Sequence, residues 1–253
     1  MSLYLVRGQV DIGALGRWAR DRAWGRRGRS EIYDEGLALH HLLAESFGKG
    51  VFQPFRLLVS PGARKANLYG YAGTDSETLR CAAEAAMLPD AMDVLAPASL
   101  GTKRMPQGWA PGQRFGFDIC LRPVVRLHKA TATHGARSEV DAFLAEALRD
   151  HAGEPEGMAR AGRSREDVYA DWLAGRLGKA ATVDTARLVR FRRVRSVRSG
   201  RVVEGPEVVL QGDLVISDPT AFADVLRRGI GRHRAYGYGM ILLRPQGTRP
   251  PTC

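Results

Sequence analysis

Two adjacent histidines, His40 and His41, are the side chains of this sequence best suited to move a proton. An imidazole titrates near neutral pH, so it can act as a general acid or a general base. Both lie in residues 36–47 (GLALHHLLAESF), where apolar residues at helical spacing predict an amphipathic helix. On this helix His40 falls at the edge of the buried face, beside Phe47, where a groove can receive it, and His41 projects into solvent. The alternative is a helix-edge histidine with no chemical role.

A glycine-rich loop over residues 229–239 (GIGRHRAYGYG) is the second feature with chemical potential. Its glycines let backbone amides approach a phosphate chain, and its arginines and aromatic rings can surround that chain. It follows a helical segment and lacks the lysine and Ser/Thr of a P-loop, which disfavours a nucleotide cofactor and a nucleotide triphosphatase. The alternative is an ordinary glycine-rich connection to a strand. The candidate RNA-binding residues of this loop are Gly229, Gly231, Arg232, His233, Arg234, Tyr236, Gly237 and Gly239.

Arginines form two clusters in a chain of formal net charge +11, a charge that favours an anionic partner such as nucleic acid. Residues 187–201 hold seven of them, with Ser199-Gly200 as the predicted tip of a hairpin. So many like charges repel one another without a counterion, and a basic hairpin can enter a groove of structured RNA. The alternative is a solvated basic surface. The candidate RNA-binding arginines are Arg17, Arg20, Arg22, Arg26 and Arg29 near the N-terminus, and Arg190, Arg192, Arg193, Arg195, Arg198 and Arg201 in the predicted hairpin.

The remaining histidines and the three cysteines show no metal-ligand spacing, because neither a CxxC pair nor a regular His/Cys set occurs. We therefore expect no metal site, no cofactor and no disulfide framework, and a metal-dependent nuclease is disfavoured. No apolar run approaches the roughly 18–20 residues that span a bilayer. The first residues lack the features of a secretory signal. These observations predict a cytoplasmic protein without a membrane partner.

The elements that must position these residues follow a repeated order. Residues 2–10 predict a strand, and the helix over 36–47 follows. The next segments predict two strands over 52–60 and 66–72 and a helix over 76–88 that begins at Ser76 as N-cap. This is the order of a ferredoxin-like unit that lacks only its last strand. A segment rich in Pro, Gly and Met, residues 89–112, is predicted to be a linker.

A second set of elements follows the linker. Asp218-Pro219 predicts the start of a helix over 219–228, with Asp218 as N-cap and Pro219 at the first helical position. We predict an α+β protein of two tandem ferredoxin-like (RRM-like) domains, residues 1–110 and 111–253, the second with a helical insertion over about 135–180. Its other predicted elements are strands over 115–127, 186–198, 206–216 and 239–244, and helices over 138–150 and 165–177 joined by residues 152–164.

Four segments of the chain resemble one known family. Residues 229–243 (GIGRHRAYGYGMILL), after the helix DPTAFADVLRRG, are similar to the C-terminal signature of the CRISPR-associated repeat-RNA endoribonucleases of the RAMP superfamily, in particular their CasE type. The helix with Leu39-His40 resembles the first helix of this family, which carries its active-site histidine. Residues 111–124 (PGQRFGFDICLRPV) resemble the strand that opens the second domain, and residues 166–178 (EDVYADWLAGRLG) resemble a helix ending in a Trp-Leu motif. Only the C-terminal loop is a specific signature.

The resemblance implies metal-independent cleavage of precursor CRISPR RNA at the base of each repeat hairpin. In the family, the ribose 2′-hydroxyl attacks the adjacent phosphate and leaves a 2′,3′-cyclic phosphate and a 5′-hydroxyl. It implies His40 as general base or acid, with arginines stabilising the phosphorane charge. The hairpin and the N-terminal arginines would bind the RNA stem, and the glycine loop would position the strand. The expected partners are the repeat stem-loop and other subunits of a CRISPR effector ribonucleoprotein.

Two departures from the family pattern widen the set of catalytic candidates. The tyrosine that often stands three residues before the family's histidine is replaced by Leu37, and Tyr33 lies seven residues upstream. The N-terminal basic segment is also longer than in the family, as in a divergent relative such as the processing protein of a type IV system, in which arginines share the catalytic work. The catalytic candidates are therefore His40, His41, Tyr33 and Arg27.

Two other functions remain open from the sequence. One is a non-catalytic RAMP-type subunit that holds guide RNA without cutting it. The other is a general basic RNA-binding protein of the ribosome-assembly type, which would show no preference for a repeat hairpin.

Overall fold

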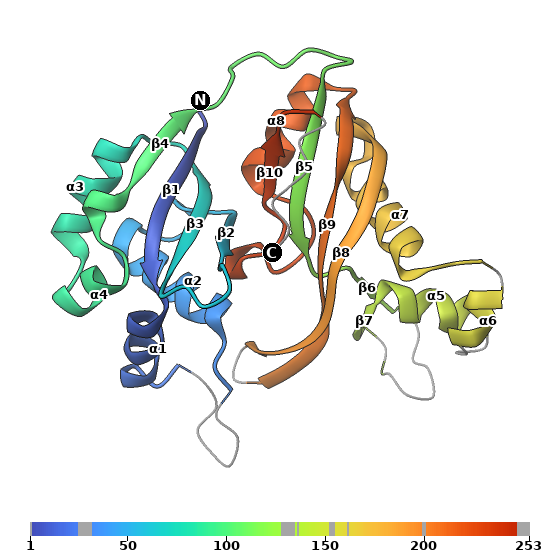
Figure 1. Ribbon diagram of the computed structural model, residues 1–253, viewed down its shortest axis with the longest axis horizontal. Coiled ribbons are helices and arrows are strands. Elements are labelled where there is room, and N and C mark those ends of the chain that lie inside the picture. Colours follow the sequence, from blue (N-terminus) through green and yellow to red (C-terminus); the bar gives the residue numbers. More distant parts are fainter. Residues whose placement is uncertain are drawn as a thin grey trace.

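Two four-stranded antiparallel sheets stand side by side, each with helices packed against it (Figure 1). The structure is a computed structural model that describes residues 2–24, 32–127, 135, 137–151, 155–160, 162–198 and 201–246. Both sheets have the strand order of a ferredoxin-like domain, in which the first and third strands are central. The predicted α+β fold with tandem ferredoxin-like units is confirmed.

The first sheet has the order β2-β3-β1-β4. Its helices pack on one face, where apolar side chains such as Val6 and Leu68 of the sheet meet Leu15 and Leu39 of the helices. The elements of this half are β1 (Tyr4–Asp11), α1 (Ile12–Asp21), α2 (Glu35–Phe47), β2 (Phe55–Leu58), β3 (Lys65–Ala72), α3 (Ser76–Ala86), α4 (Pro89–Val94), the 3₁₀ turn η1 (Pro97–Ser99) and β4 (Gly101–Arg104).

The predicted linker over residues 89–112 is wrong in its first part, because it contains α4 and β4. Strand β4 pairs with β1 and is the fourth strand that the sequence pattern lacked. It is short and mostly exposed, so it shows none of the apolar alternation that marks a half-buried strand. The N-cap of α3 is Asp75, whose carboxylate accepts a hydrogen bond from the Thr78 amide at 3.0 Å, and not Ser76.

The second sheet has the order β10-β5-β9-β8, which repeats the arrangement of the first. The hairpin of β8 and β9 extends well beyond the other strands and curves towards the N-terminal half (Figure 1). The elements are β5 (Arg114–Leu121), β6 (Val124–Arg126), β7 (Glu139–Asp141), α5 (Ala142–Asp150), α6 (Pro155–Arg160), α7 (Arg165–Leu177), the 3₁₀ turn η2 (Gly178–Ala180), β8 (Ala181–Arg198), β9 (Arg201–Ile216), α8 (Pro219–Arg228), the 3₁₀ turn η3 (Arg234–Tyr236) and β10 (Ile241–Arg244).

Several predicted elements of this half need correction. The single strand over 115–127 is two strands, since Pro123 separates β5 from β6, and β6 pairs with β7 as a small separate sheet. The helix over 138–150 begins only at Ala142, after β7, and the segment 152–164 contains α6. Helix α7 has the predicted bounds, and α8 begins with Asp218 as N-cap, its carboxylate accepting from the Ala221 amide at 3.0 Å.

Buried polar contacts join the two halves. Arg56 of β2 forms an ion pair with Asp118 of β5, and both side chains are largely buried. The Tyr71 hydroxyl donates to the Ile241 carbonyl at 2.9 Å. At the far end, the Val197 amide of the hairpin donates to Asp34, just before α2, at 2.8 Å. These contacts hold α2 and the second sheet in one fixed arrangement.

Candidate functional site

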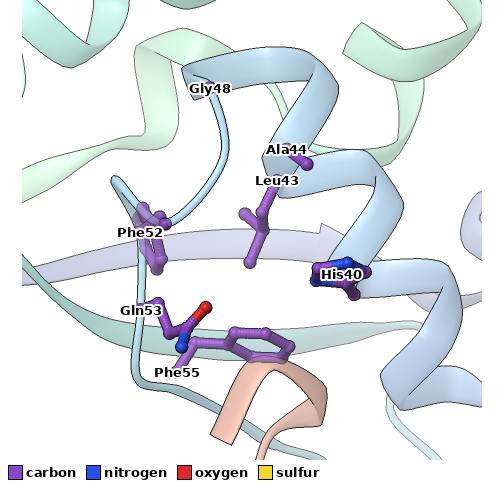
Figure 2. Close-up of a pocket in the computed structure, with 8 residues that line it drawn as sticks. His40, Leu43, Ala44, Gly48, Phe52, Gln53 and Phe55 are labelled. Carbon is purple, nitrogen blue, oxygen red and sulfur yellow. The ribbon is translucent and has the colours of Figure 1, made fainter. Parts of the chain in front are cut away.

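Helix α2 presents His40 at the boundary between its buried and exposed faces. Asp34 caps the helix by accepting from the Leu37 amide at 3.0 Å, and Leu39 and Leu43 are buried in the core beneath it. His40 is half-buried, as the helical wheel predicted. Its ring lies beside Phe55 at the rim of a small hollow (Figure 2). The hollow measures about 10 Å³, room for a single water, so it is too small to hold a nucleotide.

His40 faces the glycine-rich loop of the other half. The ring of Tyr236, in η3, lies 5.1 Å from the His40 ring between centroids, with the planes tilted by 53°. The loop comes so close to α2 that a Cβ on Gly36 would sit 2.5 Å from the Tyr236 carbonyl oxygen. The histidine and the loop, which the sequence singled out separately, therefore form one site.

The glycine loop has a defined backbone. Gly229, Gly231, Gly237 and Gly239 all have positive φ, between 72° and 89°, which side-chain-bearing residues rarely adopt. The Ile230 amide donates to the Gly239 carbonyl at 2.8 Å, closing the base of the loop. The loop is thus a closed turn with η3 at its tip.

Side chains from other elements hold this loop. Glu139 of β7 binds Arg232 Nε at 2.5 Å and His233 Nε2 at 3.1 Å. Tyr238 is buried, and its hydroxyl donates to Glu207 at 2.9 Å.

His233 was predicted to bind RNA, but its side chain is only 13% exposed and pairs with Glu139 within the protein. Arg232 and Arg234 keep exposed surface, and Arg234 donates to the Arg228 carbonyl at 2.9 Å.

The arginines of the β8–β9 hairpin have counterions within the protein. Glu207 of β9 pairs with Arg190 at 3.3 Å and with Arg192 at 2.6 Å, and Glu204 pairs with Arg193 at 2.8 Å. Three of these charges are therefore neutralised by carboxylates on the partner strand, which the sequence pattern did not reveal. Arg195 is exposed. The side chains of Arg198 and Arg201 lie outside the described part of the structure.

Acidic and phenolic groups gather where α2 begins and the hairpin passes. Burial raises the pKa of the Glu35 carboxyl, an effect that Arg192 opposes and Glu207 reinforces. Burial, together with the charges of Glu35 and Asp34, also raises the pKa of Tyr33 above its usual range. Tyr33 is about half exposed, at 49%. The phenol is therefore protonated at neutral pH and is a weaker acid than that of an ordinary tyrosine.

His41 does not project into solvent, contrary to the prediction. Its ring stacks on Trp24, with centroids 4.2 Å apart and planes 20° from parallel. Burial lowers the pKa of His41, an effect that the charge of Glu45 opposes. The sequence did not reveal this contact because Trp24 lies beyond the end of α1, outside any regular element.

The N-terminal arginines divide into two groups. Arg17 and Arg20 are exposed on α1. Arg22 was predicted to bind RNA, yet its guanidinium lies 4.4 Å from the Trp18 ring centroid and 2.6 Å from Asp90, where it ties α1 to α4. Arg26, Arg27 and Arg29 lie outside the described residues, so their predicted roles stay predictions.

Within the described ranges, no cluster of three or more His, Cys, Asp or Glu side chains is arranged to hold a metal ion. None of the described helices is both long and apolar enough to cross a membrane.

Comparisons with known proteins place these features in a family. The sequence profile described as CRISPR associated protein matches residues 3–245. The solved structure of Thermus thermophilus Cse3 bound to an RNA representing a pre-cleavage complex aligns with a TM-score of 0.64 at 17% identity, covering 97% of this chain and 100% of that one. Escherichia coli str. K-12 CRISPR-associated protein Cas6e aligns with a TM-score of 0.58 at 18% identity, covering 96% and 99%.

A chain of a CRISPR RNA-guided surveillance complex aligns with a TM-score of 0.51 at 15% identity, covering 96% of this chain and 99% of that one. A comparison with curated protein sequences finds no match. At these identities the likeness to the solved structures concerns the fold.

Proposed function

The chain belongs to the CRISPR-associated protein family, and from this premise we propose that it matures CRISPR RNA as an endoribonuclease. It cuts precursor CRISPR RNA at the repeat hairpin without a metal ion or cofactor. The cut RNA stays bound, and the protein becomes a subunit of a larger effector ribonucleoprotein in the cytoplasm. The family match and the fold shared with Cse3 and with a chain of a surveillance complex support this proposal.

The observation that carries the proposal is the contact between His40 and Tyr236. A proton-transfer group on α2 lies against a glycine loop whose amides, arginines and aromatic rings are suited to an RNA strand. The adjoining hollow admits no more than a water, so an RNA hairpin would bind across the surface that His40 and the loop share.

The proposed reaction is an internal transfer at phosphorus. The 2′-hydroxyl oxygen forms a bond to the adjacent phosphorus, the bond from phosphorus to the 5′-oxygen breaks, and the products carry a 2′,3′-cyclic phosphate and a 5′-hydroxyl. His40 removes the 2′-hydroxyl proton as base or supplies the proton to the leaving oxygen as acid. Tyr33, seven residues upstream of His40, is a second candidate proton donor. Arginines stabilise the charge of the phosphorane.

RNA binding is assigned to exposed cations of α1, of the β8–β9 hairpin and of the glycine loop. Arg17 and Arg20 of α1, Arg195 of the hairpin, and Arg232 and Arg234 of the loop keep solvent-exposed surface. Phosphate contacts of this kind fix the register of the RNA on the protein.

The test is incubation of the purified protein, in excess EDTA, with a labelled repeat hairpin from its own genome. We expect a single cut that leaves a cyclic phosphate, and no cut when the nucleotide before the cut carries a 2′-deoxyribose. Tight binding with no cut would favour the subunit that only holds guide RNA. Equal binding of unrelated hairpins would favour a general RNA-binding protein.

A further inference from the structure

Glu139, a residue that no sequence motif singled out, connects the helical insertion to the glycine loop. It is the first residue of β7 and is paired in register with Arg126 of β6. Its carboxylate accepts from Arg232 Nε at 2.5 Å and contacts His233 Nε2 at 3.1 Å. Glu139 is 19% exposed and His233 13% exposed, so solvent weakens this contact less than it weakens a surface pair.

A continuous set of contacts leads from Glu139 to His40. His233 adopts a left-handed backbone conformation, φ 61°, which is unusual for a residue with a side chain. Its carbonyl accepts a hydrogen bond from the Tyr236 amide at 2.8 Å, which forms the turn η3. The Tyr236 ring then contacts the His40 ring, with centroids 5.1 Å apart. A carboxylate that holds His233 therefore also fixes where Tyr236 stands.

The insertion is itself anchored, so Glu139 has a rigid base. The Trp172 indole of α7 donates to the Val124 carbonyl of β6 at 3.3 Å. The same indole ring lies against the loop, because a Cβ on Gly231 would sit 2.7 Å from Trp172 Cη2. The insertion thus contacts the loop at two places.

We infer that Glu139 is a positioning residue for the cleavage: through His233 and Tyr236 it sets the loop against His40. The inference rests on the proposed function, since it assigns Glu139 a part in that reaction. Glu139 does not touch the reacting atoms. Because it also neutralises Arg232, it opposes RNA binding while it supports cleavage.

The test compares Glu139→Ala with Glu146→Ala in the intact protein. Glu146 of α5 is a matched control: it accepts two hydrogen bonds from Arg163 within the same insertion, and it is 17% exposed. Glu139→Gln, which keeps the side-chain volume and one acceptor, serves if the alanine variant fails to fold. The measurements are single-turnover cleavage, affinity for the repeat hairpin, and hydrogen exchange of the loop amides.

We expect Glu139→Ala to slow cleavage on the order of 100-fold, the effect of a small misplacement of reacting groups. Hairpin affinity should stay the same or increase, and the amides of residues 229–239 should exchange faster. Glu139→Gln should change cleavage in the same direction by a smaller factor, and Glu146→Ala should match the wild type. A parallel loss of cleavage and affinity would indicate a merely structural role and overturn the inference.

The hydrogen-exchange measurement separates this inference from the proposed function. The wild type could bind the hairpin without cutting it. Loop amides that exchange faster in Glu139→Ala than in the wild type and in Glu146→Ala would then still support the positioning of the loop by Glu139. Unchanged loop exchange in both Glu139 variants would overturn the inference, whether or not the wild type cuts RNA.

Discussion

His40 and His41 are consecutive on α2, yet their rings contact different parts of the molecule. His40 faces Tyr236 of the glycine loop, and His41 stacks on Trp24 after α1. The rings also contact each other edge to face, with centroids 5.3 Å apart. This arrangement sets His40 against the glycine loop and makes His41 part of the packing between α1 and α2.

His41 should make the stability of the protein depend on pH. Burial lowers its pKa in the folded state, so the unfolded chain takes up the proton more readily. The stabilisation is therefore full above the unfolded pKa of about 6.5 and is lost as the pH falls below it. We expect the free energy of unfolding in urea to decrease less from pH 7 to pH 5 in His41→Phe, which keeps the ring stack, than in the wild type. Identical pH profiles would contradict this role.

At the scale of elements, the sequence predicted the helix boundaries that depend on residues near each helix end. Helix α8 begins where Asp218-Pro219 signals a cap, and α7 has its predicted bounds. Strand β4 could not be recognised, because its polar residues are stabilised by pairing with β1 and not by burial.

The candidate site could be predicted only in its parts. His40 and the glycine loop carry local signals, namely helical spacing and repeated glycines. Their contact depends on how the two halves pack, and neither local pattern encodes it. The same holds for Glu139 and Glu207, whose roles come from partners that are distant in the chain.

The β8–β9 hairpin mixes paired and unpaired arginines. Arg190, Arg192 and Arg193 have carboxylate partners on β9. Arg195 is exposed, and no carboxylate within the described residues forms an ion pair with it. The net positive charge available to RNA is therefore smaller than the number of arginines indicates.

Arg195→Ala should weaken binding of the repeat hairpin several-fold and reduce the slope of log affinity against log salt by about 1, because one phosphate contact is lost. Arg22→Ala is the control, since Arg22 packs on Trp18 and pairs with Asp90. It should lower the free energy of unfolding by about 1 kcal/mol and leave the salt slope unchanged. Titrations at several salt concentrations and urea unfolding measure both effects. Equal salt slopes for Arg195→Ala and the wild type would contradict the assignment.

At the scale of the whole molecule, the proposed function requires both halves in a fixed arrangement, because His40 comes from the first and Tyr236 from the second. The Arg56–Asp118 ion pair and the hydrogen bond from Tyr71 to Ile241 join the sheet of the first half to the sheet of the second. The division into domains near residue 110 falls between β4 and β5 and stays a prediction.

Asp118→Ala should destabilise the protein by about 3–5 kcal/mol, because it leaves the buried Arg56 guanidinium without its counterion. It should also slow cleavage at temperatures where the variant is still folded, since the two halves lose a contact that aligns them. Tyr71→Phe is a milder control that should cost about 1 kcal/mol, the worth of one hydrogen bond. Urea unfolding and single-turnover cleavage test both variants, and an Asp118→Ala protein as stable as Tyr71→Phe would contradict this account.

The central claim is that His40, set against the glycine loop, cuts hairpin RNA. Its most direct test is the single-turnover cleavage rate of His40→Ala with saturating protein in EDTA, beside His151→Ala, a histidine at the end of α5 in the insertion. We predict that His40→Ala slows the cut by on the order of 10²–10⁴ with unchanged hairpin affinity, and that His151→Ala cuts like the wild type. A His40→Ala protein that cuts at the wild-type rate would contradict the claim and indicate that arginines are the catalytic groups.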